Sequence, residues 1–377
     1  MKIVTVAGAR PNFVKIAPLL KEMRRYPTIV PVLVHTGQHY DRDMADQFFE
    51  DLQIRPPDVN LGVGSGSHAA QTAEVMKRLE SVLEEMRPDL VLVVGDVNST
   101  LAAALTAVKL GIRVAHVEAG LRSFDRAMPE EINRLLTDTM SDLLFITEES
   151  GRQNLLREGI DPERIHFVGN VMIDALQMFR GHWERSSIFK RLGLNAGRRY
   201  AVLTLHRPSN VDDPLVLTNL LEALHEVSCH LPIVFPVHPR VMPRLLQQRN
   251  LFWLRSDSRE HVPDKGIACL SPLGYLDFIA LVSKADMVLT DSGGIQEETT
   301  ILGVSCLTLR ETTERPVTVS HGTNRVVGTE PRQIVEEALG TMRHPSRRNG
   351  PPPLWDGHAA SRVVKILLER RLQAGRS

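Results

Sequence analysis

The chain has 377 residues, 42% of them hydrophobic, so it can bury one or two sizeable cores, and two domains of ordinary size are expected. Its 45 basic and 45 acidic side chains balance, which gives neither nucleic acid nor an anionic membrane surface a general attraction. The three cysteines lack CxxC spacing, and no apolar run is long enough for a signal-peptide core or a membrane span, so we expect a cytoplasmic protein that binds neither membrane nor nucleic acid.

The first half of the chain alternates strand-like and helix-like segments. A β-rich run at residues 2–7 leads through a Gly-Ala-Arg-Pro turn into a helical pattern at residues 13–25, which is typical of the opening unit of a doubly wound domain. Residues 90–94 form a continuous apolar run, as expected of a parallel strand covered on both faces. The remaining predicted segments are strands at 30–36, 114–117, 143–146 and 165–168 and helices at 44–52, 69–86, 99–110, from 129 onward, and at 148–158.

A second series of the same kind follows the poorly patterned residues 186–199. A basic, proline-rich loop at 343–353 then precedes a final amphipathic helix at 358–372. We predict an α/β protein of two doubly wound Rossmann-like domains facing across a cleft: residues 1–168, residues 169–357, and a helix at 358–377 that either stays on the second domain or returns to the first. The second series comprises strands at 200–205, 233–236, 267–270, 287–290 and 304–309, the last closing the sheet, and helices at 214–228 and from 294 through 302.

Residues 114–134, VAHVEAGLRSFDRAMPEEINR, place acids on both sides of one loop. Glu118 follows an apolar run, and Pro129 starts a helix whose first turn carries Glu130 and Glu131. Carboxylates that flank an arginine-containing loop predict an active-site rim, because perturbed carboxylates cluster at functional sites. The alternative interpretation is a capped helix with solvated acids.

Residues 290–298, TDSGGIQEE, carry the strongest ligand pattern outside that stretch. Ser292, Gly293 and Gly294 allow close backbone approach at a helix N-terminus, where unpaired amides favour a phosphate. An acid one turn later, such as Glu298, can accept hydrogen bonds from ribose hydroxyls. A capped helix after a buried strand is the alternative. Arg315, at the end of RETTER, either lies over the same phosphates or belongs to a solvated charged turn.

Other charged and titratable residues also follow predicted strands. Arg10 and Lys15 flank the start of the first helix, which suits an anion, although both can equally be surface charges. His206 and His238 each end a strand, and His206 is a candidate acid or cation for a leaving group. The sequence contains neither GxxxxGK[ST] nor HExxH, so we predict no catalytic metal.

Taken together, these motifs resemble those of the non-hydrolysing UDP-N-acetylglucosamine 2-epimerases. The resemblance implies a fold of the glycosyltransferase-B type with a UDP-sugar in the interdomain cleft. It also implies a homodimer that needs no cofactor, acts in polysaccharide biosynthesis, and forms UDP-N-acetylmannosamine by eliminating UDP and adding it back to a 2-acetamidoglucal. The motifs run in order from residue 1 to about residue 328: GARPNFVKIAPLL, Gly95-Asp96, HVEAGLRS, MPEEINR, His206-Arg207, PVHPR, TDSGGIQEE and TTERP.

The resemblance also implies roles for individual residues, while leaving open which carboxylate takes the C2 proton. The implied catalytic residues are Asp96, Glu118, Glu130 and His206. The implied phosphate and sugar contacts are Arg10, Lys15, Ser292, Gly293, Gly294 and Arg315, with Glu298 at the ribose and Phe278 beside the uracil.

The chain departs from one branch of the family at two places that border the sugar. Its loop at residues 123–128 is shorter, and Pro208-Ser209-Asn210 replaces an Arg-Glu pair. A modified UDP-sugar, such as a diacetamido uronic acid, is therefore an alternative substrate. A glycosyltransferase of the same fold and a non-catalytic nucleotide-sugar sensor are two further candidate functions.

Some members of this family bind a second UDP-N-acetylglucosamine as an activator. Ala70 stands here where those members have an arginine, which weakens the expectation of allosteric activation. The candidate allosteric residues are Gln38, His39, Gln71, His238 and Arg240.

Overall fold

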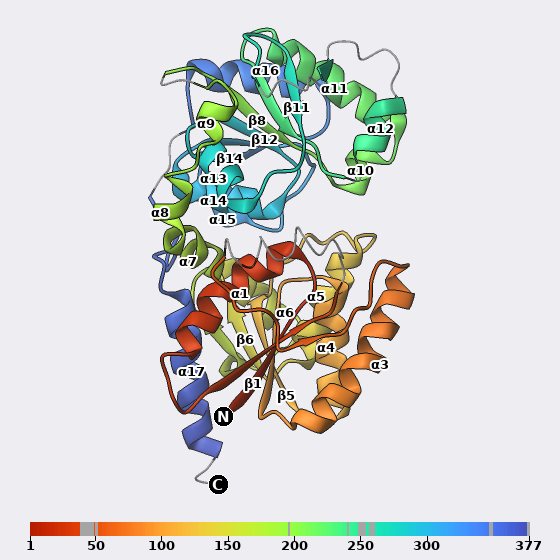
Figure 1. The fold of residues 1–377 in the computed structure, drawn as a ribbon, viewed down its shortest axis with the longest axis vertical. Coiled ribbons are helices and arrows are strands. Elements are labelled where there is room, and N and C mark those ends of the chain that lie inside the picture. Colours follow the sequence, from red (N-terminus) through yellow and green to blue (C-terminus); the bar gives the residue numbers. More distant parts are fainter. Residues whose placement is uncertain are drawn as a thin grey trace. The chain divides into compact units, whose positions relative to one another are not determined.

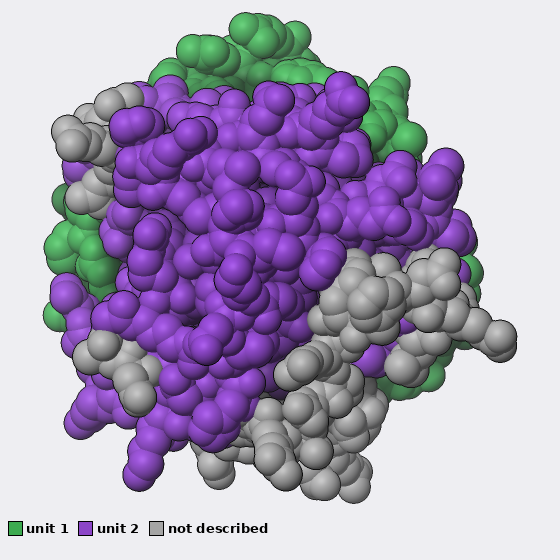
Figure 2. All heavy atoms as spheres, turned by 90° about the horizontal axis from the view of Figure 1, so that it is seen from above, with its two compact units in different colours: residues 1–178, 353–377 green, residues 179–352 purple. Residues whose placement is uncertain are grey.

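The structure, a computed structural model, describes residues 1–37, 49, 52–194, 197–239, 241–247, 254–255, 261–346 and 350–374. The chain forms two compact units, Met1–Met178 with Pro353–Ser377 and Phe179–Pro352, which Figure 2 colours separately. The first unit extends past residue 168 because helix α7 (Val171–Met178) packs against α1 (Arg10–Met23). The chain end belongs to the same unit because α17 (Ala359–Ala374) contacts both of these helices.

The first unit is a seven-stranded parallel sheet in the order β3-β2-β1-β4-β5-β6-β7. Helices α1, α7 and α17 form one packed group and α3, α4 and α5 another, and the two groups cover the sheet (Figure 1). In α3 (His68–Met86), Val75, Leu79 and Leu83 are buried because residues four apart lie on one face of a helix. The other bounds are β1 Lys2–Ala7, β2 Val30–His35, β3 Val59–Asn60, β4 Leu90–Val94, α4 Asn98–Lys109, β5 Arg113–Ala119, α5 Pro129–Met140, β6 Leu143–Ile146, α6 Glu149–Arg157, a 3-10 turn Pro162–Arg164 and β7 Ile165–Phe167.

The second unit is also a seven-stranded parallel sheet, in the order β10-β11-β9-β8-β12-β13-β14. The prediction that residues 304–309 close this sheet is wrong, because β14 (Asn324–Val326) pairs with the outer side of β13 (Ser305–Thr308). β14 has three residues and one of them is an arginine, so its apolar pattern is too short to recognise. The remaining bounds are α8 Arg180–Trp183, α9 Ile188–Arg191, β8 Ala201–Thr204, α10 Pro208–Val211, α11 Pro214–Ser228, β9 Ile233–Pro236, α12 Met242–Gln247, β10 Leu254–Arg255, β11 Ile267–Leu270, α13 Tyr275–Ser283, β12 Met287–Thr290, α14 Gly293–Leu302, α15 Pro316–Ser320 and α16 Pro331–Arg343.

Each sheet contains one point where the strand order reverses, between β1 and β4 in the first unit and between β8 and β12 in the second. In open parallel sheets, ligands bind beyond the carboxyl ends of the strands at such a point. Asp96 follows β4, His206 follows β8, and Ser292 follows β12. The predicted α/β class with two doubly wound, Rossmann-like domains is thus confirmed, and the fold places the predicted residues at both reversal points.

The predicted helix at residues 44–52 lies almost wholly outside the described residues. Among the helices that the structure does describe, none combines the length and the apolar character that crossing a bilayer requires.

Candidate functional site

Glu118 lies in an unusual stretch of β5, the strand next to β4 in the first unit. The pairing register with β6 shifts between Val117 and Ala119, and Glu118 itself has φ +74°, which is uncommon for a residue with a side chain. Bulges of this kind redirect side chains near active sites. The Glu118 carboxylate is buried and forms an ion pair with the ammonium of Lys15 from α1.

Gly95, at the end of β4, lies directly against this ion pair. A Cβ atom on Gly95 would be 3.4 Å from the Glu118 Oε2 and 3.5 Å from the Lys15 Nζ. The fold therefore brings together Lys15 and Glu118, which the sequence assigned to different roles. The next residue after Gly95 is Asp96, so the backbone places the two predicted acids Glu118 and Asp96 close together.

Asp96 is supported by α5. Its carboxylate forms an ion pair with Arg134, whose side chain is buried, and its carbonyl oxygen accepts a hydrogen bond from the Asn133 amide at 2.9 Å. About a quarter of the Asp96 side chain, 28%, stays exposed, so it can still meet a ligand. Neither partner was singled out from the sequence, although both belong to the MPEEINR motif.

The two acids in the first turn of α5 have different environments. Glu131 is buried and accepts hydrogen bonds from the backbone N–H groups of Ser123 at 2.9 Å and Phe124 at 3.0 Å, as well as from Arg134. Burial opposes ionisation of Glu131, but these hydrogen bonds and the Arg134 charge hold its pKa below the ordinary value. Glu131 thus anchors the loop that contains Ser123 and Phe124. Glu130, the predicted catalytic residue, is half-buried beside it.

In the second unit, His206 is oriented by Asp291. The His206 Nδ1 lies 2.8 Å from the Asp291 Oδ1, and Asp291 also accepts the backbone N–H groups of His206 at 3.0 Å and Arg207 at 2.9 Å. Burial opposes ionisation of Asp291, but the hydrogen bond and charge of His206 hold the pKa of Asp291 below its ordinary value. With Nδ1 engaged, a ligand would meet the ring through Nε2. Sequence reasoning missed Asp291, which directly precedes Ser292. The exposed His238 ring lies near, 5.9 Å between ring centroids.

The turn from β12 into α14 has the geometry predicted for an anion. Ser292 is the N-cap residue with an extended backbone, and Gly293 and Gly294 form the first turn of a ten-residue helix. A Cβ atom on Gly293 would be only 2.5 Å from the Arg315 Nη1, so Arg315 lies directly against this turn. Such an N-terminus presents backbone amides and a partial positive charge.

Arg315 is itself buried between two acids. Its guanidinium contacts Glu297 and Glu314, each at 2.7 Å. Arg315 therefore supports the turn, because it is held by both acids and lies against Gly293. Glu298 is also buried. The pKa of Tyr275 is raised, mainly because Tyr275 is buried and secondly because the charge of Glu298 is close to it. Phe278, the predicted uracil neighbour, is half-buried on α13.

Of the candidate allosteric residues, Gln71 is buried and linked to Asp96. The Gln71 Oε1 accepts the Asn98 amide at 2.9 Å, the Asn98 Oδ1 accepts the Asn133 amide at 3.3 Å, and Asn133 also donates to the Asp96 carbonyl. Gln38, His39 and Arg240 lie outside the described residues, as does the side chain of Arg10, whose backbone begins α1. In the described part of the chain, no group of three His, Cys, Asp or Glu side chains could hold a metal ion.

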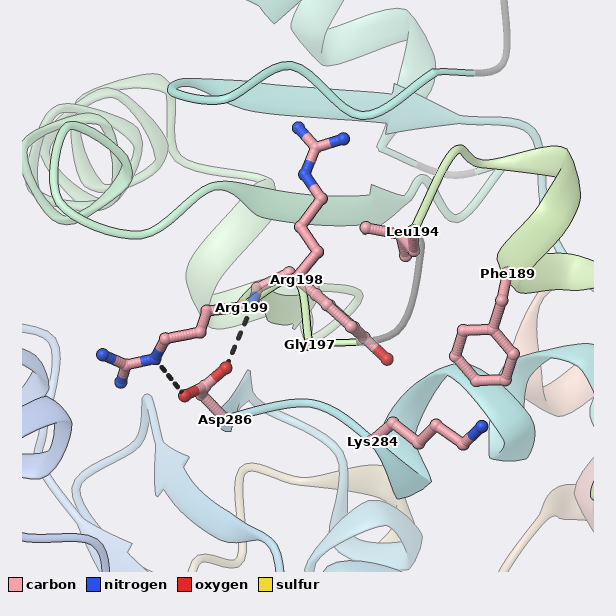
Figure 3. A pocket seen from close by; sticks show the side chains of 8 residues that line it. Phe189, Leu194, Gly197, Arg198, Arg199, Lys284 and Asp286 are labelled. Atoms are coloured by element: carbon pink, nitrogen blue, oxygen red, sulfur yellow. Dashed lines mark hydrogen bonds and ion pairs between the residues drawn. The ribbon is translucent and has the colours of Figure 1, made fainter.

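The second unit also contains a cavity of about 350 Å³ (Figure 3). It lies at the amino ends of the strands, opposite to the end that carries His206 and Ser292. Arg199 and Asp286, which form an ion pair at 2.7 Å, precede β8 and β12, and the ammonium of Lys284 lies 4.3 Å from the centre of the Phe189 ring. His206 and Ser292 follow those same strands. The cavity is therefore separate from the candidate site.

Comparison with known proteins gives matches along nearly the whole chain. Residues 21–368 match the profile of the family described as UDP-N-acetylglucosamine 2-epimerase. The UDP-N-acetylglucosamine 2-epimerase of Methanococcus maripaludis is 41% identical over 97% of this chain and 98% of its own length. The UDP-2,3-diacetamido-2,3-dideoxy-D-glucuronate 2-epimerase of Pseudomonas aeruginosa is 39% identical over 97% of this chain and 99% of its own length. A crystal structure of the Methanocaldococcus jannaschii UDP-GlcNAc 2-epimerase with UDP-GlcNAc and UDP has a TM-score of 0.89 and 40% identity, covering 98% of this chain and all of that one.

Proposed function

This chain belongs to the UDP-N-acetylglucosamine 2-epimerase family, and from that premise we propose that it interconverts UDP-N-acetylglucosamine and UDP-N-acetylmannosamine. One observation carries the proposal. Asp96 follows β4 at the reversal point of the first sheet, Glu118 lies near the carboxyl end of the neighbouring strand β5, and each carboxylate contacts a buried cation. Two carboxylates that are fixed by ion pairs at the carboxyl ends of the strands, where ligands bind, suit a reaction that removes a proton and returns it.

The chemistry explains why such a site is needed. The hydrogen on C2 of the sugar is not acidic, so C2 loses its proton as the bond from C1 to the diphosphate oxygen breaks. UDP leaves with the electrons of that bond, and a C1–C2 double bond forms. Adding UDP back at C1 while C2 gains a proton on its other face gives the epimer. The enzyme therefore has to supply proton-transfer groups at C2 and positive charge at the departing diphosphate.

We assign the proton transfers to Asp96, Glu118 and Glu130 of the first unit. The contact between Lys15 and Glu118 supports a role for Lys15 in holding Glu118, beside the anion binding expected from the sequence. Amide substitutions at the three acids determine which carboxylate takes the C2 proton.

We assign the UDP group to the second unit. The amides of Gly293 and Gly294 with Ser292 suit the diphosphate, Glu298 the ribose and Phe278 the uracil, while Arg315 supports the turn. His206 is the proposed acid for the leaving diphosphate, and Asp291 fixes the orientation of its ring. Arg10 is the further proposed phosphate contact.

A second candidate substrate is a UDP-diacetamido uronic acid. The relative that is named for that substrate is nearly as similar to this chain as the one named for UDP-N-acetylglucosamine, at 39% against 41% identity. Overall similarity therefore does not separate the two substrates. We propose that the loop at residues 123–128, which borders the sugar, decides between them.

We further propose that the protein is a cytoplasmic homodimer that supplies its product to polysaccharide biosynthesis. We also propose that Gln38, His39, Gln71, His238 and Arg240 are the residues that would bind an activating UDP-sugar. Light scattering of the purified protein tests the dimer, since a monomer mass at assay concentration contradicts it.

Incubation in heavy water tests the reaction. With UDP-N-acetylglucosamine, deuterium should appear at C2 of both epimers while free UDP stays low, because each cycle exchanges the C2 proton with solvent. Unlabelled substrate without a mannosamine epimer would refute the proposal. Transfer to an added acceptor with matching release of UDP would indicate a glycosyltransferase, and binding without exchange a sensor. Repeating the assay over a panel of UDP-sugars identifies the preferred substituents.

A further inference from the structure

His116 of β5 and Asp138 of α5 form a buried pair beneath the predicted catalytic acids, and no catalytic or binding role has been assigned to either. Both side chains are fully buried. The His116 Nδ1 lies 2.6 Å from the Asp138 Oδ1, and its Nε2 lies 2.8 Å from the carbonyl oxygen of Gly95. The other Asp138 oxygen contacts Arg122 at 2.7 Å and accepts the N–H of Gly120 at 3.0 Å.

The partners of the His116 ring define its protonation. A carbonyl oxygen can only accept a hydrogen bond, so Nε2 carries a proton. An ionised carboxylate can also only accept, so Nδ1 carries one when Asp138 is charged. Burial opposes that charge, but His116 and Arg122 together hold the pKa of Asp138 below its ordinary value. The ring and the carboxylate therefore share one proton along the short contact at Nδ1, and the Arg122 guanidinium at the other Asp138 oxygen favours the form in which Asp138 is the carboxylate.

This pair holds the backbone on both sides of Glu118. His116 binds the carbonyl oxygen of Gly95, where an added Cβ atom would lie within 3.5 Å of the Glu118 and Lys15 side chains. The N–H of Gly95 donates to the Val117 carbonyl oxygen at 3.1 Å. Asp138 binds the N–H of Gly120, two residues beyond Glu118.

Gly120 is also held by two residues of α6. Its carbonyl accepts the Asn154 amide at 2.9 Å, and a Cβ atom on Gly120 would be 2.6 Å from the Gly151 carbonyl oxygen. Glu118, with its left-handed backbone at the bulge, thus lies between two points that are both fixed by the same pair. A strained conformation persists only where its surroundings over-determine it.

We infer that His116 and Asp138 are positioning residues, whose buried charged pair holds the ends of β4 and β5 so that Asp96 and Glu118 keep the geometry that proton transfer needs. The inference rests on the proposed function. Neither residue touches the substrate, because neither has exposed surface.

The substitution Asp138→Asn tests the pair at nearly constant shape. The amide cannot accept from His116, Arg122 and Gly120 together, so the Gly95 and Gly120 peptides should shift. We expect kcat to fall ~10- to 100-fold, since a misplacement of about 1 Å can cost about 100-fold. KM should change less than about twofold, because all the residues assigned to UDP except Arg10 are on the second unit. An unchanged kcat would overturn the inference, as would a loss confined to KM.

Asp142→Asn is the matched control. The Asp142 carboxylate accepts the N–H of Val114 at 2.7 Å, so this variant also removes a negative charge that is hydrogen-bonded to β5, but at the opposite end of the strand, where the amide oxygen can still accept the bond. It should keep kcat within about twofold of the unsubstituted enzyme. An equal loss of kcat in both variants would mean that activity is sensitive to any change beside β5, and it would contradict a specific role for Asp138.

A second measurement needs no variant. In nitrogen-15 NMR spectra of the enzyme labelled at histidine, one ring should give two N–H signals that exchange slowly with water, because His116 is buried and donates from both nitrogens. A spectrum without such a ring overturns the charged pair, whatever the activity.

The two proposals fail in different ways. If the unsubstituted enzyme incorporates no deuterium at C2, the proposed function is wrong. If it does so and Asp138→Asn incorporates it equally fast, the function stands and the positioning role alone is refuted.

Discussion

At the scale of single residues, backbone strain and predicted chemistry coincide. Among the described non-glycine residues with positive φ, Glu118 at +74° and Phe124 at +60° lie in one short stretch. Left-handed backbone costs such residues on the order of 1 to 3 kcal/mol and clusters at functional sites. Phe124 is held by Glu131 while 72% of its surface is exposed, which places an aromatic ring where substrate choice is proposed.

Replacing Asp96, Glu118 or Glu130 by its amide tests their assignment. Each change keeps the shape and removes the proton-transfer group, so turnover should fall by at least ~10²-fold, the low end for a general acid or base. Steady-state epimerisation and deuterium incorporation measure the loss, and the variant that loses exchange at C2 identifies the base. Glu149→Gln is the control, since Glu149 is exposed and forms an ion pair with the partly exposed Arg152, and such pairs contribute little. Near-normal rates in all three variants would refute the assignment.

At the scale of elements, α5 organises the first unit's site. Glu131, Arg134 and Asp138 are three and four residues apart, so they lie on one face of the helix. From that face they hold the loop at residue 123, the Asp96 carboxylate and the Gly120 peptide. The helix that begins with the proposed catalytic Glu130 thus also fixes the residues around it.

In the second unit, α14 plays the corresponding part, and Gly293→Ala tests it. The added methyl would meet the Arg315 Nη1 at 2.5 Å and the Glu314 Oε1 at 2.7 Å, so the turn or the arginine has to move. Forced overpacking costs about 1 to 3 kcal/mol, and we expect UDP affinity to weaken roughly tenfold or more by calorimetric titration. Gly340→Ala, in α16 with no atom near the added methyl, should leave affinity unchanged. Unaltered affinity in Gly293→Ala would argue against this turn as the diphosphate site.

At the scale of the whole molecule, the end of the chain completes the core of the first unit. α17 buries Val363, Val364 and Leu367 and contacts α1 and α7, and Asp174 of α7 accepts the N–H groups of Ala359 and Ala360 at its start. The first unit is therefore built from two segments that lie far apart in the sequence, and its stability depends on α17 as well as on residues 1–178.

Leu367→Ala measures this dependence. Truncating a buried leucine removes apolar contacts and leaves a cavity, so the free energy of unfolding of the first unit should fall by about 2 to 5 kcal/mol. Lys365→Ala, two residues away on the exposed face, should change it by less than about 0.5 kcal/mol. Denaturant unfolding followed by circular dichroism compares the two variants. Equal stabilities would mean that α17 does not contribute to the core.

The sequence by itself determined the elements with strong local patterns and the end of the sheet where the chemistry lies. Strands β4, β6, β9, β11 and β12 were predicted with the bounds that the structure has, because a buried parallel strand is a continuous apolar run. The strand-end residues Asp96 and Ser292 followed from two of these runs, and His206 from the predicted strand at 200–205. Short edge strands such as β14 were missed, since three residues carry no period.

Only the tertiary structure decided which side chains meet. Lys15 and Glu118 are 103 positions apart, and His206 and Asp291 are 85 apart, so no spacing in the sequence links them. Residue type and spacing also could not separate Glu131, which anchors a loop, from its neighbour Glu130, which only the family resemblance singled out, because the difference lies in burial and hydrogen bonds. Residue type and local period determine a strand and the residues at its carboxyl end. The partner that orients a carboxylate is decided when distant segments pack together.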